Sequence, residues 1–166
     1  MTEKDQIDVA IRIGLLILTF FLGFFASRLT MTKKERKDYK AKLQETSNIL
    51  LRSLDDQFQR FTLVLKEYTS LQGPPTLTEF YRVSTVGEGY FGQMKMICDS
   101  ILSGNIDQQS VMHTHRQTIK EAVEKSLPAF YETLQTIAED QGIEYSGKLK
   151  RDNYESIYLV YDKFCC

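Results

Sequence analysis

Residues 47–80 read SNILLRSLDDQFQRFTLVLKEYTSLQGPPTLTEF, and this stretch predicts two helices with a tight connection between them. In its first part, small and apolar side chains recur at alternating steps of four and three residues, which places them along one side of a helix. They are Ser47, Leu51, Leu54, Phe58, Phe61, Leu65 and Tyr68. Leu50, Leu63 and Val64 widen this stripe beyond the narrow seam of a dimeric coiled coil, so we expect a helix that packs in a bundle.

The connection between the two helices is marked by prolines and by a capping pattern. Pro74 and Pro75 end the first helix, because proline lacks an amide donor and its ring clashes with the preceding helical turn. Thr76 and Glu79 have the spacing of a capping box, in which each residue satisfies a free backbone amide of the other. The second helix is therefore expected to begin at Thr76.

Helical periodicity continues to the carboxyl terminus, and alternation of the β type is absent. Gly104 and Gly142 are expected to end helices, Asn105 or Asp107 to cap one, and Pro128 to kink a helix or start a new one. The expected helices cover about 33–71, 76–104, 105–126, 127–142 and 148–164. The prediction for 43–166 is thus an all-α, mainly antiparallel bundle of four to five helices.

Three glycines lie within the second predicted helix. Gly87, Gly89 and Gly92 each weaken a helix, so they indicate close approach of another helix, a kink or a local break. We favour close packing. A phosphate loop is not supported, since these glycines lack both a preceding strand and a following Lys-Ser/Thr pair.

Upstream of the bundle, residues 9–29 read VAIRIGLLILTFFLGFFASRL and predict a transmembrane helix. As a helix the segment would be roughly 31 Å long, close to the hydrocarbon thickness of a bilayer. Its uncharged stretch, 13–26, is short for a span, so Arg12 is expected to reach toward the headgroups. The alternative is a soluble core helix. The acidic start and the bulky Phe24 before Ala26 argue against cleavage as a signal peptide.

The orientation of this span follows from its basic flank. Residues 28–42 carry seven basic and two acidic side chains, a net charge of +5, whereas 43–166 carry 12 basic and 17 acidic ones. By the positive-inside rule, 1–8 lies outside, 9–29 spans the membrane, and the 30–42 juxtamembrane segment and the 43–166 bundle are cytoplasmic. The basic residues expected to contact anionic lipid are Arg28, Lys33, Lys34, Arg36 and Lys37. Alternatively this flank serves only as a topology signal. Nothing in the charge indicates nucleic acid as a partner.

Two features suggest association with other proteins. Thr19, Gly23 and Ser27 repeat every four residues within the span, a strip of small residues that lets transmembrane helices approach closely. In the last predicted helix, Tyr154, Tyr158 and Tyr161 share one side, and tyrosine suits half-exposed interfaces. The alternative for the tyrosines is a fully buried terminal helix.

No catalytic, cofactor or metal site can be assembled from the sequence. His113 and His115 are two residues apart and point to different helix faces. Cys98 lies on an apolar stripe, which predicts a buried and unreactive thiol. Cys165 and Cys166 are expected to be thiols in a reducing compartment, with acceptance of a lipid as the alternative.

The sequence therefore favours a non-enzymatic, membrane-anchored protein-interaction or regulatory module at the cytoplasmic face of the membrane. Its expected partners are membrane lipids and either a second copy of the chain or another protein. Two alternatives remain. One is a membrane-acting effector that oligomerises through its transmembrane helix. The other is a helical-bundle sensor that binds a small molecule near residues 87–92.

Overall fold

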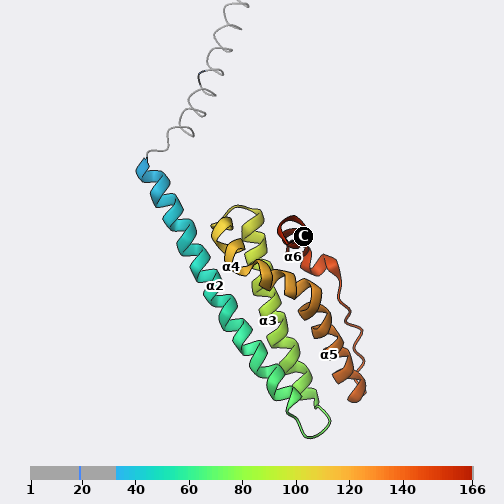
Figure 1. Ribbon diagram of the computed structural model, residues 1–166. Helices are drawn as coiled ribbons and strands as arrows, with labels where there is room; N and C mark the ends of the chain where they lie inside the picture. Colours follow the sequence, from blue (N-terminus) through green and yellow to red (C-terminus); the bar gives the residue numbers. More distant parts are fainter. Residues whose placement is uncertain (1–18, 20–32, 166) are drawn as a thin grey trace, which may run out of the picture. The chain divides into compact units, whose positions relative to one another are not determined.

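A computed structural model describes Thr19 and residues 33–165, and all regular secondary structure in this part of the chain is helical. Along the chain these residues contain α2 (Lys33–Thr69), α3 (Leu77–Leu102), α4 (Gln108–Glu121), a π-helical turn (Ala122–Ser126), α5 (Leu127–Asp140), a 3₁₀ turn (Arg151–Tyr154) and α6 (Glu155–Phe164) (Figure 1). Residues from Lys42 onward form one compact unit, and all packing described below is within this unit. The predicted all-α bundle is confirmed for it.

The predicted transmembrane helix lies outside the described residues, apart from Thr19. In the part of the chain that the structure describes, no helix has both the length and the hydrophobicity to cross a bilayer. The span over 9–29 thus stays a prediction.

The α2–α3 hairpin forms where the sequence places it, and the two helices lie side by side (Figure 1). The Glu79 carboxylate accepts a hydrogen bond from the backbone amide of Thr76 at 2.8 Å, which satisfies one of the free amides at the start of α3. The Thr76 hydroxyl also donates to this carboxylate and lowers the pKa of Glu79 below its ordinary value. The predicted capping box is confirmed.

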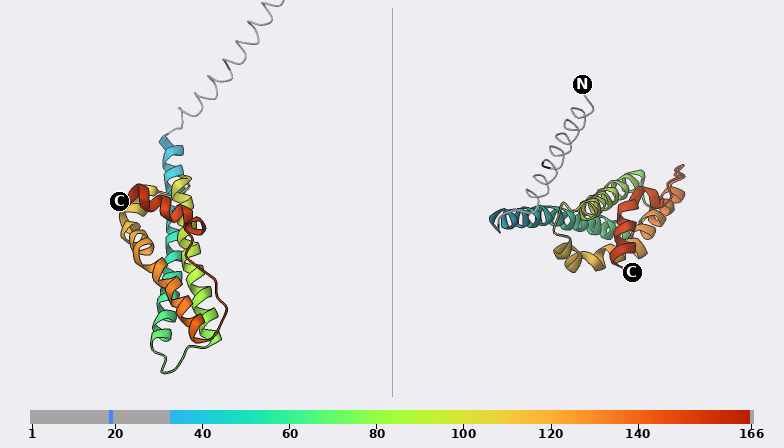
Figure 2. Two further views of the ribbon diagram at one scale, coloured as in Figure 1. Left: turned by 90° about the vertical axis from the view of Figure 1, so that its right-hand side faces the viewer. Right: turned by 90° about the horizontal axis from the view of Figure 1, so that it is seen from above.

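Helix α3 is the central helix of the unit and packs against both α5 and α6 (Figure 2). Its buried side chains point in several directions, as expected for a helix with neighbours on more than one side; they include Phe80, Val83, Tyr90, Phe91, Met94, Ile97, Cys98 and Ile101. Gly87 lies against the ring of Phe130 in α5: a Cβ at Gly87 would be 2.1 Å from Phe130 Cε2. Close packing is confirmed at Gly87, whereas nothing lies within 4 Å of a Cβ at Gly92.

The passage from α4 to α5 is a widened turn rather than a loop. Asp107 caps α4 by accepting a hydrogen bond from the Ser110 amide at 3.3 Å. At the other end, the Leu127 amide donates to the Ala122 carbonyl, five residues back, just before Pro128. Because proline has no amide to donate, a wider turn here lets the chain continue from α4 into α5 without a break.

The predicted helix over 148–164 is wrong in its first part. After Gly142, whose φ of 62° helps to end α5, residues 143–150 are not helical, and α6 begins only at Glu155. This segment runs back along the bundle (Figure 1), and its Tyr145 ring lies 5.2 Å from that of Phe80. The Gln135 side chain also donates to the Gly147 carbonyl at 3.2 Å. Here the apolar side chains reach the bundle from an extended chain, so no helix is needed to bury them.

The stripe of side chains predicted on α2 is only partly buried. Ser47, Leu54 and Phe61 are buried in the bundle. Leu51 and Leu65 are half-buried, whereas Phe58 is 49% exposed although the periodicity places it at the centre of the seam. Phe58 borders the cavities described next.

Candidate functional site

Two adjoining cavities lie between α2 and the layer formed by α4, the π-helical turn and α5. Phe58 and Ser126 line both of them. The Tyr90 pocket, with a volume of about 250 Å³, is lined by Leu54, Asp55, Phe58, Tyr90, Thr114, His115, Thr118, Glu121 and Ser126. The Phe58 groove, with a volume of about 320 Å³, is lined by Phe58, Phe61, Thr62, Leu65, Lys125, Ser126, Ala129, Phe130 and Thr133.

A cluster of aromatic rings connects the groove to the core. The Phe61 ring lies 5.6 Å from that of Tyr90, 5.8 Å from Phe91 and 5.9 Å from Phe130. These separations are typical of favourable aromatic pairs, so this cluster forms a packed base below the groove. Phe58 contacts only the edge of the cluster, through Tyr90 at 5.5 Å, and leaves half of its surface to solvent.

Tyr90 presents a hydroxyl group to the first cavity. The residue is 2% exposed, yet its hydroxyl makes no hydrogen bond with any residue that the structure describes. Since no fully buried side-chain oxygen or nitrogen of these residues lacks a partner, the hydroxyl must reach the open space of the pocket. Burial raises the pKa of Tyr90 to about 12, and the nearby carboxylates of Glu121 and Asp55 add to this effect. The hydroxyl is therefore protonated at neutral pH.

The Tyr90 pocket is acidic. Asp55 comes from α2 and Glu121 from α4, so the two carboxylates stand on different walls of the cavity. The Glu121 carboxylate accepts one hydrogen bond, from the Gln117 amide at 2.8 Å, and keeps further acceptor capacity. In the described residues no group of three or more His, Cys, Asp or Glu side chains is arranged to hold a metal ion. The chemistry of the pocket suits an organic cation.

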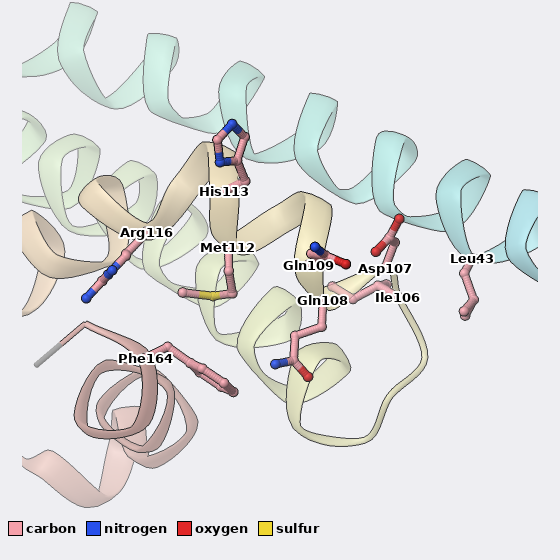
Figure 3. A pocket seen from close by; sticks show the side chains of 9 residues that line it. All are labelled: Leu43, Ile106, Asp107, Gln108, Gln109, Met112, His113, Arg116 and Phe164. Carbon is pink, nitrogen blue, oxygen red and sulfur yellow. The ribbon is translucent and has the colours of Figure 1, made fainter.

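A second, wider hollow lies at the other end of α4. Its volume is about 820 Å³, and Figure 3 shows Met112 of α4 and Phe164 of α6 pointing toward the same space, with Leu43 on α2 at the far side. The half-buried Asp107 also lines it, but its carboxylate already caps α4. The other polar side chains of its lining are exposed, namely Gln108, Gln109, His113 and Arg116. Among the described polar residues that line this hollow, none is as buried as Tyr90 is in its pocket. We therefore take the Tyr90 pocket and the Phe58 groove as the candidate site.

The structure does not bring the three predicted interface tyrosines together on one surface. Tyr154 is 8% exposed and lies within the bundle, where its hydroxyl is 3.1 Å from that of Tyr131. Burial raises the pKa of Tyr154 above its ordinary value. Tyr158 and Tyr161 are half-buried: the Arg151 guanidinium lies 4.7 Å from the Tyr158 ring centre, and the Tyr161 hydroxyl donates to Glu124 at 2.8 Å. Only these two remain near the surface.

The residues predicted for the membrane fall mostly outside the described part. Thr19 is helical and exposed. The first turns of α2 contain the basic residues predicted to contact lipid, all of them exposed, namely Lys33, Lys34, Arg36 and Lys37. Outside the described residues lie Arg12, Gly23, Ser27 and Arg28.

The cysteine and histidine predictions can be compared directly with the structure. Cys98 is fully buried, which confirms the predicted burial, and burial raises the pKa of its thiol to about 12. The buried Cys165 thiol donates to the Arg116 carbonyl at 3.6 Å. His115 is half-buried in the Tyr90 pocket, whereas His113 is exposed and borders the wider hollow, so the two do face different ways.

Sequence reasoning missed the convergence of Asp55, Tyr90 and Glu121. One part of the signal was readable, because Asp55 and Phe58 are three residues apart and share a helix face. The contributions of α3 and α4 carried no such signal. Comparison of the chain with protein-family models, with curated proteins and with solved structures finds no match. The geometry of the two cavities is therefore the basis for the function of this chain that follows.

Proposed function

We propose that the chain is a non-enzymatic, membrane-anchored interaction module whose helical unit receives an apolar segment of a partner protein in the Phe58 groove. The observation that carries this proposal is the exposure of Phe58. This large apolar side chain is 49% exposed on the wall of a cavity whose base consists of buried aromatic rings. Large aromatic side chains beside a preformed cavity are typical anchors of protein interfaces.

The size and lining of the groove favour protein side chains over a larger cofactor. A volume of about 320 Å³ is at the small end of the range for ligand pockets. Its lining is mostly apolar, and among the described residues that line it only Lys125 is charged. The acidic side chains of the adjoining pocket, Asp55 and Glu121, favour a segment that is basic next to its apolar residues.

Membrane attachment would place this site at the cytoplasmic face. The supports are the apolar composition of 9–29 and the basic residues that follow it. Attachment to a surface raises the effective concentration of a partner at the same membrane, so a low affinity at the groove would suffice for binding. Reporter fusions test the topology: the carboxyl terminus should lie in the cytoplasm, and an extracytoplasmic result would overturn this part of the proposal.

Photo-cross-linking tests the groove in the full chain within its own membranes. A photoreactive phenylalanine analogue at Phe58 should cross-link to an apolar or amphipathic segment of another protein, identified by mass spectrometry of the linked peptide. The matched control carries the analogue at Ile49 of α2, which is 62% exposed and is not among the residues that line the Tyr90 pocket or the Phe58 groove. Ala129→Trp, a substitution of an exposed residue that fills the groove, should abolish the Phe58 product.

Three outcomes would contradict the proposal. Equal yields from positions 58 and 49 would indicate non-specific proximity. Insensitivity to Ala129→Trp would place the contact outside the groove. A linked peptide from a second copy of the chain would show self-association in place of a partner protein.

A second candidate function, small-molecule sensing, is favoured by one observation. A ligand near residues 87–92 was one alternative that the sequence left open, and Tyr90, within that range, lines a cavity with a hydroxyl that has no hydrogen-bond partner among the described residues. A free cation such as agmatine would then stabilise the full chain against thermal unfolding. Absence of any shift at millimolar agmatine would remove this candidate.

A further inference from the structure

The Tyr90 pocket has three features that together define a ligand. Its base holds Tyr90, a residue that is 2% exposed and whose hydroxyl reaches the cavity without a hydrogen-bond partner among the described residues. Its walls hold the carboxylates of Asp55 and Glu121. Its rim holds the exposed ring of Phe58, tilted by 50° against that of Tyr90.

These groups match a planar cation better than a compact one. A guanidinium group has five N–H donors in one plane, which can serve two carboxylates and a hydroxyl oxygen at once. The flat face of a guanidinium group also stacks on aromatic rings, and the group is less strongly hydrated than an ammonium group. The hydroxyls of Thr114, Thr118 and Ser126 provide further acceptors around the cavity.

Because the two cavities adjoin, one partner segment can supply both the cation and the apolar side chains. Phe58 and Ser126 line both, so a group in the Tyr90 pocket lies next to whatever occupies the Phe58 groove. A helical segment with an arginine three residues from an apolar side chain presents both on one face. Asp55 lies on α2 and Glu121 on α4, so one bound cation would also link these two helices.

We propose that the Tyr90 pocket binds an arginine side chain of the same partner segment whose apolar residues occupy the Phe58 groove. This inference rests on the proposed function and names the polar half of its recognition. The arginine lies between the two carboxylates, donates to the Tyr90 hydroxyl oxygen and stacks on Phe58.

The test uses the full chain, labelled with nitrogen-15, in nanodiscs of uncharged phosphatidylcholine. The probe is acetyl-Arg-Ala-Ala-Leu-Leu-amide, and its matched control replaces arginine by citrulline, which has nearly the same shape but no charge. Affinities come from changes in the amide signals of Thr118 and of Tyr90 as each peptide is added. The arginine peptide should bind about 5-fold more tightly than the citrulline control, the upper end of what one exposed ion pair contributes.

Variants of the pocket assign this preference to named groups. Asp55→Asn and Glu121→Gln should each reduce it by about 5-fold or abolish it, and Glu121→Gln keeps an oxygen for the Gln117 hydrogen bond. Tyr90→Phe, which removes only the hydroxyl, should weaken the arginine peptide more than the citrulline peptide. The control is Asp140→Asn, an exposed carboxylate at the end of α5 that lines neither cavity, and it should change nothing.

Each opposite result overturns the inference. Equal binding of the two peptides would show that the pocket does not recognise the charge. An effect of Asp140→Asn as large as that of Asp55→Asn would reduce the preference to overall charge. Agmatine binding as tightly as the peptide would assign the pocket to a free small cation. If cross-linking at Phe58 still succeeds in any of these cases, the proposed function stands and only the arginine site fails.

Discussion

Replacement of Gly87 by alanine tests the close contact between α3 and α5. The added Cβ would lie 2.1, 2.6 and 2.7 Å from the Cε2, Cζ and Cδ2 atoms of Phe130, so the ring must move. Phe130 is 2% exposed and its ring lies 5.3 Å from those of Phe91 and Tyr131, which leaves it little room. Overpacking of this kind costs about 1–3 kcal/mol, against a gain of up to about 1 kcal/mol from alanine's helix propensity.

The expected net result is a loss of about 1–2 kcal/mol of unfolding free energy. For a helical unit of this size that corresponds to a melting temperature lower by about 4–8 °C. The matched control is Gly92→Ala, five residues further along the same helix, where nothing lies within 4 Å of the new Cβ. Without a clash, only the propensity gain remains, so this variant should melt about 2–4 °C higher.

Thermal unfolding of the full chain in detergent micelles, followed by far-ultraviolet circular dichroism, measures both variants. Shifts of opposite sign are the signature of the α3–α5 contact, because the same chemical change is made twice in one helix. In a Phe130→Leu background, the penalty of Gly87→Ala should shrink, since the clashing ring atoms are gone. A Gly87→Ala variant that melts as high as the wild-type chain would refute the proposed approach of the two helices.

Three further predictions concern buried groups. Ser47→Ala should cost about 1–2 kcal/mol in urea unfolding, because the Ser47 hydroxyl accepts a hydrogen bond from the Asp107 amide at 2.9 Å and this amide would lose its partner. Thr46→Ala should change little, because the half-buried Thr46 donates only to the Lys42 carbonyl of its own helix. Burial raises the pKa of Tyr90 and of Cys98 to about 12. The unfolded chain therefore releases these protons first, so unfolding free energy should fall as pH rises from about 9 to 12, and less steeply in Cys98→Ala. At neutral pH, maleimide should label Cys98 only after denaturation, and rapid labelling of the folded chain would contradict its burial.

Local chemistry allowed much of the helical architecture to be predicted. The start of α3 follows from Thr76 and Glu79, and the ends of α3 and α5 follow from Gly104 and Gly142, whose φ angles are 70° and 62°. Each of these signals acts between residues a few positions apart. The buried stripe of α5 was also predictable, because a helix repeats its face every three to four residues; it consists of Phe130, Leu134, Ile137 and Ala138.

The candidate site could not be predicted in the same way. Leu54 and Phe58 belong to one sequence stripe, yet Leu54 is 3% exposed and Phe58 49%. Periodicity shows that two side chains share a face but not what stands opposite each of them. The segment before α6 shows the same limit, since Tyr145 is half-buried against the bundle from an extended chain.

By itself, then, the sequence determined the helical class, most helix ends and the apolar faces, together with the expectation of a membrane anchor. Only the tertiary structure decided which apolar side chains remain exposed and which polar ones meet. Asp55, Tyr90 and Glu121 lie on three different helices and converge on one cavity because of how those helices pack. Helix formation depends on neighbours along the chain, whereas a pocket depends on distances between residues that are far apart in it.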